Sequence, residues 1–226
     1  MELNQLFSQM AVDLADVDGR DETIESVAEY ARIAVGADDA GVMLVHGGDR
    51  VETPAGTSED VDKAHQLQAH YGEGPCWSAL AGGNAVYIVT QTSEDNRWPL
   101  WGKAAAELGY HSVVSASLET NSRRIGSLNV YSRKPKAFDD SDAGIVDLLS
   151  GHATAAIVAA KTEADLKKAL GSRKMIGQAE GILMHAYGID SERAFAYLRR
   201  LSQDQNVKLV KIAESVIKEC GNLGAT

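Results

Sequence analysis

The spacing of apolar residues changes once along this chain, and that change restricts the fold more than any other feature. From Asp139 onward, apolar residues recur every three or four positions with no strand-like stretch, which is the period of an α-helix. Before Asp139, short runs rich in β-branched residues alternate with helical segments and glycine-containing turns. The sequence therefore predicts a mixed domain followed by an all-helical part.

The front of the chain carries signals for both helices and strands. Helical spacing is expected in the first forty residues, at residues 58–71 and in a short segment that ends near Gly109. Strands are expected at residues 40–46, 50–53, 85–90, 111–119 and 124–131. Tight turns are expected at residues 47–49 and 120–122. Helices around four or five strands fit an α+β domain with one antiparallel sheet flanked by helices.

A long helix is expected to start at Asp139 or Asp140, since a carboxylate can accept hydrogen bonds from the free amides of a first turn. Along this helix a thin heptad seam is spaced 4, 3, 4, 3, 4, 3, 4, through Ile145, Leu149, His152, Ala156, Ala159, Glu163, Leu166 and Leu170. Such a seam joins two subunits or packs on the domain's own sheet. Pairing of two subunits through this linker helix is the favoured interpretation.

The tail divides into three short amphipathic helices, which are typical of a small bundle. Gly188 is expected to end the first helix, Asp190 to cap the second and Asn206 to cap the third. The predicted organisation is an α+β domain at residues 1–150, a coiled-coil-like helical linker at 151–168 and an all-α three-helix bundle at 169–226.

Charge is divided unevenly along the chain. The net charge is −10, but residues 1–160 hold 11 Lys and Arg against 24 Asp and Glu, whereas residues 161–226 hold 11 against 8. A mildly basic tail on an acidic body can still attract phosphates locally. The two cysteines, Cys76 and Cys220, form no CxxC pair, which favours a reducing cytoplasm. No apolar run approaches 18 residues and no signal peptide is evident, so no membrane association is predicted.

The tail resembles the ANTAR domain of bacterial regulators. The similarity starts at residues 169–173 and continues through residues 176–184 (Ile-Gly-Gln-Ala-Glu-Gly-Ile-Leu-Met), 191–195, 198–199, 206–209 and 212–213. The resemblance implies RNA binding and transcription antitermination by dimers that engage paired RNA hairpins. One position departs from the family pattern, because Glu180 stands where a lysine is usual, and a carboxylate there would repel phosphate.

The front is similar to the GAF domain that precedes ANTAR in actinobacterial regulators. The matching segments are residues 71–77 (Tyr-Gly-Glu-Gly-Pro-Cys-Trp), 97–99 (Arg-Trp-Pro), Gly109 and residues 126–131 (Gly-Ser-Leu-Asn-Val-Tyr). A GAF–ANTAR transcription antitermination regulator is thus the family suggested for nearly the whole chain. GAF-like domains bind small molecules in a cavity between sheet and loops, so a small-molecule ligand is a candidate partner of the front domain.

An RNA-binding surface is expected on the tail. Lys174 and Gln178 lie one helical turn apart and opposite the expected buried stripe, and Arg173 matches the family motif. Lys and Arg keep the positive charge that phosphate contacts need. The candidate RNA-binding residues are Arg173, Lys174, Gln178, Arg199, Lys208 and Lys211. For each, a solvated helix face is the alternative interpretation.

A ligand pocket is the candidate site of the front domain, because aromatic-lined cavities suit planar or apolar ligands. Its candidate residues are Tyr71, Cys76, Trp77, Trp98, Trp101 and His111. Alternatively these side chains only fill a core. No catalytic residue and no cofactor is assigned, since no nucleophile elbow, P-loop or dinucleotide fingerprint occurs. The six scattered histidines have no metal-ligand spacing.

The sequence therefore predicts a cytoplasmic, dimeric, non-enzymatic RNA-binding regulator that responds to a ligand or to redox state. Two alternatives remain: a protein–protein adaptor whose bundle binds a partner helix, and a small-molecule sensor without RNA output. An enzyme in the front domain is the weakest hypothesis, because no catalytic constellation is visible.

Overall fold

The computed structural model of the chain describes residues 3–17, 19–46, 50–82, 85–121 and 124–223. They form two compact units, Met1–Lys161 and Thr162–Thr226. The three domain ranges expected from the sequence stay a prediction. The turn expected at residues 47–49 lies outside the described residues, as does part of the turn at 120–122.

The N-terminal unit is an antiparallel sheet with helices on both faces. Its strands are β1 (Asp39–His46), β2 (Arg50–Gly56), β3 (Val86–Val89), β4 (Ser112–Glu119) and β5 (Arg124–Ser132). Its helices are α1 (Leu3–Asp16), α2 (Arg20–Ala34), α3 (Glu59–Tyr71), α4 (Pro75–Leu80), α5 (Pro99–Glu107), the short 3₁₀ helix η1 (Thr92–Glu94) and the first turns of α6 (Asp140–Tyr187). The α+β class and the antiparallel sheet expected from the sequence are confirmed.

The strand order is β2-β1-β5-β4-β3, and every neighbouring pair is antiparallel. The expected hairpin of β4 and β5 is present, with Ser115 opposite Asn129. Successive side chains of a strand point to opposite faces, so the buried residues of β4 and β5 separate into two sets. Val114, Leu128 and Val130 join the large apolar cluster that includes residues of α2 and α6.

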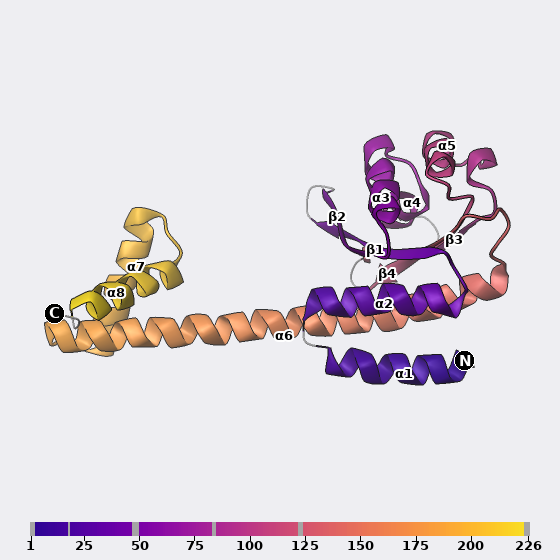
Figure 1. The fold of residues 1–226 in the computed structure, drawn as a ribbon. Helices are drawn as coiled ribbons and strands as arrows, with labels where there is room; N and C mark the ends of the chain where they lie inside the picture. Colours follow the sequence, from indigo (N-terminus) through magenta and orange to yellow (C-terminus); the bar gives the residue numbers. More distant parts are fainter. Residues whose placement is uncertain (1–2, 18, 47–49, 83–84, 122–123, 224–226) are drawn as a thin grey trace. The chain divides into compact units, whose positions relative to one another are not determined.

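The opposite face of the sheet is covered by α3, α4 and α5 (Figure 1). A second cluster lies there, centred on Trp98, Trp101, Tyr110 and Tyr131. The residues of β4 and β5 on this side include Ser115, Ser127 and Asn129, which are fully buried. The sheet thus has one apolar face and one face with polar side chains in its interior.

Helix α4 was not expected from the sequence. It follows Gly74, whose φ of 128° suits glycine, and it starts with Pro75, a residue favoured in the first turn of a helix. A Cβ on Gly74 would lie 2.2 Å from Oε1 of Gln68, so the turn also needs a residue without a side chain. These two residues turn the glycine-rich segment back over the sheet.

Helix α6 starts with reciprocal capping, as expected for this position. Oδ1 of Asp139 accepts hydrogen bonds from the backbone N–H groups of Ser141 (2.8 Å) and Asp142 (3.0 Å), and Oδ2 of Asp142 accepts from the N–H of Asp139 (3.0 Å). In the heptad seam, Leu149 is buried in the unit's own core, with Ile145 packed against it. Early in the helix the seam therefore faces its own sheet rather than forming a continuous exposed stripe.

The C-terminal unit contains the end of α6 with α7 (Ser191–Gln205) and α8 (Leu209–Leu223), so the predicted three-helix arrangement is confirmed. Gly188 follows α6 with a φ of 65°, and Asp190 caps α7 by accepting from the N–H of Arg193 at 2.8 Å. The expected role of Asn206 was wrong: it adopts φ 51° and ends α7 instead of capping α8. Asparagine tolerates this left-handed conformation better than most residues.

One described helix, α6, is long and apolar enough to cross a membrane by length and composition alone. Its most apolar 18-residue window has a mean hydropathy of 1.5, and 39% of that window is buried. Core helices of soluble proteins meet the same criterion, and Val146, Leu149, Ala153 and Ile157 of α6 pack inside the N-terminal unit. This helix is weak evidence for a membrane span.

Candidate functional site

Three of the six predicted pocket residues are buried in the N-terminal unit, where they are packed as core. Cys76 and Trp101 are fully buried and Trp98 is 5% exposed. The two indole rings meet edge to face at 6.2 Å. Nε1 of Trp98 donates to Oγ of Ser78 at 2.8 Å, and Nε1 of Trp101 donates to the carbonyl of Ala64 at 3.3 Å. Both indole N–H groups therefore have a hydrogen-bond acceptor within the protein, as those of buried tryptophans usually do.

The other three predicted residues are less buried. Tyr71 is 37% exposed at the end of α3, with its ring edge-on to that of His70 at 4.9 Å. Trp77 is half-buried on α4, and His111 is half-buried before β4. The role of these six residues in ligand binding stays a prediction.

A buried polar cluster that the sequence did not predict lies on the same face of the sheet. It consists of Thr53, His65, Gln68, Cys76, Ser115, Ser127 and Asn129. Asn129 is central: its Oδ1 accepts from Sγ of Cys76 at 2.7 Å, and its Nδ2 lies 3.0 Å from Nε2 of His65. Asn129 between Leu128 and Val130 fits the ordinary alternation of an antiparallel strand, so the sequence carried no distinct signal that this side chain is buried.

The environment of this cluster favours uncharged side chains. Burial lowers the pKa of His65 to about 3, so the imidazole is neutral. Burial also raises the pKa of the Cys76 thiol, which disfavours the thiolate that redox chemistry needs. Nearby, the hydroxyl of Tyr131 is buried without a hydrogen-bond partner among the described residues. The arrangement resembles a neutral hydrogen-bonded core more than a nucleophilic or redox centre.

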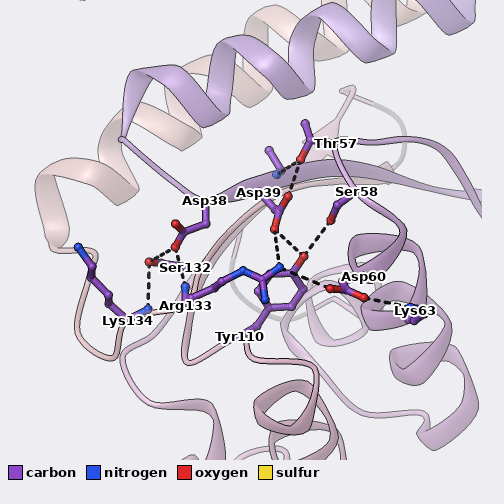
Figure 2. Close-up of polar contacts among 11 residues, drawn as sticks. Asp38, Asp39, Thr57, Ser58, Asp60, Lys63, Tyr110, Ser132, Arg133 and Lys134 are labelled. Atoms are coloured by element: carbon purple, nitrogen blue, oxygen red, sulfur yellow. Dashed lines mark hydrogen bonds and ion pairs between the residues drawn. The ribbon is translucent and has the colours of Figure 1, made fainter.

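Charged residues gather instead at the start of β1 and the end of β5, two central strands of the sheet, around Arg133 (Figure 2). Nη2 of Arg133 lies 3.5 Å from Oδ2 of Asp39 and 3.4 Å from Oδ2 of Asp60. The hydroxyl of Tyr110 donates to Oδ2 of Asp39 at 2.9 Å, and the guanidinium lies 5.4 Å from the centre of the Tyr110 ring. These contacts tie β1, α3 and the end of β5 together. Arg133, Asp39, Asp60 and Tyr110 thus pair with one another, and the network stabilises the packing of these elements.

No group of three or more potential metal ligands occurs among the described residues. His46 was one of the six histidines considered, and its side chain lies outside the described residues. His65 is held by Thr53 and Asn129, with its Nδ1 3.0 Å from Oγ1 of Thr53. Both ring nitrogens therefore already have partners.

The C-terminal unit exposes most of the predicted RNA-binding residues. Its core is small and is formed by Ala179, Leu183, Ala194, Leu198, Ile212 and Ala213. Outside this core, Arg173, Lys174, Arg199 and Lys208 are exposed and make no ion pair with another described residue. Lys211 differs, because its Nζ lies 2.7 Å from Oε2 of Glu214. Four candidate cations are thus free for an external anion.

The predicted residues do not all lie at one place on the unit. Arg173 lines a pocket between α6 and α7 together with Glu180 and Phe195. Gln178 lines a different, apolar groove between α6 and α8. Phe195 and Arg173 lie 22 positions apart in the sequence, and only the packing of α7 on α6 joins them.

Two exposed tyrosines lie at another position on this unit. The ring centres of Tyr187 and Tyr197 are 6.4 Å apart, and the side chains are 68% and 46% exposed. Exposed aromatic rings are common stacking partners of unpaired bases.

Comparison with known proteins identifies both units. The family model described as "GAF domain" matches residues 18–158, and that described as "ANTAR domain" matches residues 164–217. A curated relative, the "Nitrate regulatory protein" of Klebsiella oxytoca, is 39% identical over 54 residues. That match covers 24% of this chain and spans 14% of the length of the relative.

Solved structures are similar to the N-terminal unit in fold. The GAF domain of a phosphoenolpyruvate-protein phosphotransferase from Coxiella burnetii matches with a TM-score of 0.58 at 14% identity, covering 72% of this chain and 96% of that one. A free methionine-R-sulfoxide reductase from Neisseria meningitidis, in complex with its substrate, matches with 0.54 at 18% identity, covering 71% and 91%. A phytochrome photosensory core module from Stigmatella aurantiaca matches with 0.61 at 12% identity, covering 88% and 44%.

At these identities the structural matches define the fold alone, whereas the family models assign both parts of the chain. The GAF model covers the antiparallel sheet with its helices, and the ANTAR model covers the three-helix unit. The chain therefore belongs to the GAF domain family and carries an ANTAR domain at residues 164–217.

Proposed function

We propose that this protein is a cytoplasmic, dimeric antiterminator whose C-terminal unit binds RNA hairpins and whose GAF domain senses a signal. One observation carries the proposal: the three-helix unit exposes Arg173, Lys174, Arg199 and Lys208 without ion-pair partners among the described residues. Unpaired cations on a helical surface supply the phosphate contacts that dominate affinity for nucleic acids.

The charge balance supports this assignment to one unit. Residues 161–226 hold 11 Lys and Arg against 8 Asp and Glu, whereas residues 1–160 hold 11 against 24. The acidic N-terminal unit would repel RNA, and the basic unit would attract it. RNA contacts are therefore expected to be confined to the C-terminal unit.

Pairing of two chains through the linker helix is the second part of the proposal. Every residue of α6 from 161 to 171 is exposed, and Leu166 and Leu170 are each 60% exposed. A helical segment without packed neighbours is only marginally stable in water. A second copy of the same helix would cover these leucines and give two RNA-binding units per dimer.

The sensor's part in the proposal is regulatory rather than catalytic. A ligand or redox signal would change the populations of two conformations of the GAF domain and thereby change RNA binding. The buried polar cluster around Asn129 supplies hydrogen-bonding groups for such a response. No catalytic role is proposed, because the charged network around Arg133 is structurally paired.

The proposal is tested by sequencing the RNA that co-purifies with the protein, with Arg173→Ala as the comparison. We expect the wild type to enrich a small set of transcripts with hairpins, and the variant to lose most of that enrichment. Recovery of the same background RNA by both proteins would refute the RNA assignment.

A second candidate function is a protein–protein adaptor, favoured by one observation. The groove between α6 and α8 has a volume of about 500 Å³ and is lined by apolar side chains that include Ile182, Ala186 and Ile217. Salt distinguishes the two candidates. With four free cations per chain, the slope of log affinity against log salt concentration should be about −3 to −4 for RNA. Apolar docking of a partner helix should strengthen slightly or stay constant as salt rises.

A further inference from the structure

The pocket between α6 and α7 combines three kinds of side chain that rarely meet on a solvated helix surface. It has a volume of about 610 Å³, and its lining includes the cation of Arg173, the carboxylate of Glu180 and the ring of Phe195. All three belong to the C-terminal unit. A cation, an acceptor and an aromatic ring are the groups that proteins use to hold one unpaired base of an RNA.

Phe195 provides the aromatic surface. It lies on α7, and 39% of its side chain is exposed although the adjacent Ala194 is fully buried. Its ring therefore lies at the border between the small core of this unit and solvent. A base stacked on an aromatic ring contributes about 1–3 kcal/mol to the binding of single-stranded nucleic acid, so an exposed ring in a concave surface is suited to this contact.

Glu180 provides hydrogen-bond acceptors and no donor. Its Oε2 accepts a hydrogen bond from Oγ of Ser191 at 3.2 Å, and no Lys or Arg pairs with it among the described residues. A carboxylate would repel a phosphate but attracts the amino group on the edge of a base. The residue that departs from the family pattern is therefore suited to contact a base rather than the backbone.

Arg173 and Gly177 complete the pocket. Arg173 lies about two helical turns before Glu180 on α6 and is exposed without an ion-pair partner among the described residues. Nothing lies within 4 Å of the position that a Cβ on Gly177 would take. A phosphate can therefore pair with the guanidinium while the attached nucleotide approaches the backbone of α6 closely.

We propose that this pocket holds one unstacked nucleobase of the bound RNA, stacked on Phe195, with its exocyclic amino group donating to Glu180 and its phosphate paired with Arg173. The proposal rests on the RNA binding proposed above. Adenine, cytosine and guanine carry an exocyclic amino group, and uracil has none. The pocket thus discriminates against uracil at one position of the RNA.

The test uses the full-length protein and a pool of RNA hairpins with one constant stem and a fully randomised loop. RNA retained by the wild type is sequenced, and the enriched hairpin is then remade with uracil at each loop position in turn. We expect uracil to be depleted at one loop position, and its introduction there to weaken binding about tenfold, the loss typical of a hydrogen bond to a charged group.

Glu180→Gln is the decisive variant, because glutamine keeps the size of the side chain and can still accept from Ser191. Its amide can also donate to a uracil carbonyl, so the discrimination should fall to within about twofold. Glu219→Gln removes an exposed carboxylate on α8 that does not line the pocket, and it should keep the full discrimination. Phe195→Leu should weaken binding to every loop sequence, with the helical content checked by circular dichroism.

The outcomes distinguish failure of the base pocket from failure of RNA binding itself. If hairpins bind but no loop position disfavours uracil, or if Glu180→Gln discriminates as strongly as the wild type, the base pocket is refuted and RNA binding stands. The same conclusion follows if Phe195→Leu and Glu180→Gln leave RNA affinity unchanged but abolish binding of a partner protein. If the wild type retains no hairpin from the pool, RNA binding itself fails.

Discussion

Replacement of Leu198 by alanine should strongly destabilise the C-terminal unit and leave the stability of the GAF domain unchanged. Leu198 is fully buried, and three of the other five buried residues in its cluster are alanines. Truncation of a buried leucine costs about 2–5 kcal/mol. At about 0.05–0.15 kcal/mol per residue, a unit of this length is stable by about 3–10 kcal/mol. The substitution therefore removes a large part of the stability of the unit.

Unfolding of the two units can be followed separately. The three tryptophans of the chain, Trp77, Trp98 and Trp101, all lie in the N-terminal unit. Tryptophan fluorescence therefore follows the GAF domain alone during unfolding in urea. Circular dichroism at far-ultraviolet wavelengths follows the helices of both units. In Leu198→Ala we expect part of the helical signal to be lost at a lower urea concentration, while the midpoint of the fluorescence transition is unchanged.

Val207→Ala is the matched control, because this side chain lies in the same unit and is 38% exposed. A substitution at such a surface position usually changes stability by less than about 0.5 kcal/mol. Equal displacement of the fluorescence and helical transitions by Leu198→Ala would show that the two units unfold as one. No displacement of either transition would show that Leu198 is not part of a stabilising core.

Three further outcomes follow from individual contacts. Because His65 has a pKa of about 3 when folded and about 6.5 when unfolded, its contribution to stability is present above pH 6.5. It is lost by about 1.4 kcal/mol per pH unit on acidification, so His65→Gln should flatten the pH dependence of the fluorescence midpoint. A thiol reagent should modify the exposed Cys220 in the native protein and the buried Cys76 only after unfolding; rapid loss of both thiols would contradict this. Asp190→Ala removes the cap on the N–H of Arg193 and should destabilise the C-terminal unit by about 1 kcal/mol in urea.

Local signals in the sequence were enough to place most elements. Gly188 and Asp190 are residues whose chemistry acts within a few positions, and both lie where the sequence expected them, at the end of α6 and the start of α7. Asn206 shows the limit of such signals. It is favoured both at the start of a helix and in the left-handed conformation that ends one, and only the path of the chain between α7 and α8 decides between these roles.

The side-chain contacts inside the GAF domain could not be predicted from such local signals. The sequence contains the tryptophans, but their distance from a cavity depends on how α3, α4 and α5 pack on the sheet. His65 and Asn129 are 64 positions apart and meet only because α3 packs on the face of the sheet to which Asn129 points. Arg173 and Phe195 likewise meet only through helix packing. A site depends on such contacts between elements, which local sequence signals do not determine.

The arrangement of β5 indicates how a change in the sensor interior could reach helix α6. Asn129 belongs to the polar cluster on one face of the sheet, and its neighbours Leu128 and Val130 belong to the apolar cluster on the other face. Leu149 of α6 is part of that same apolar cluster. A close-packed core responds to a shift of one strand by moving side chains on both sides. We therefore expect a rearrangement of the hydrogen bonds of Asn129 to change the packing of α6 through this one strand, without a ligand touching the helix.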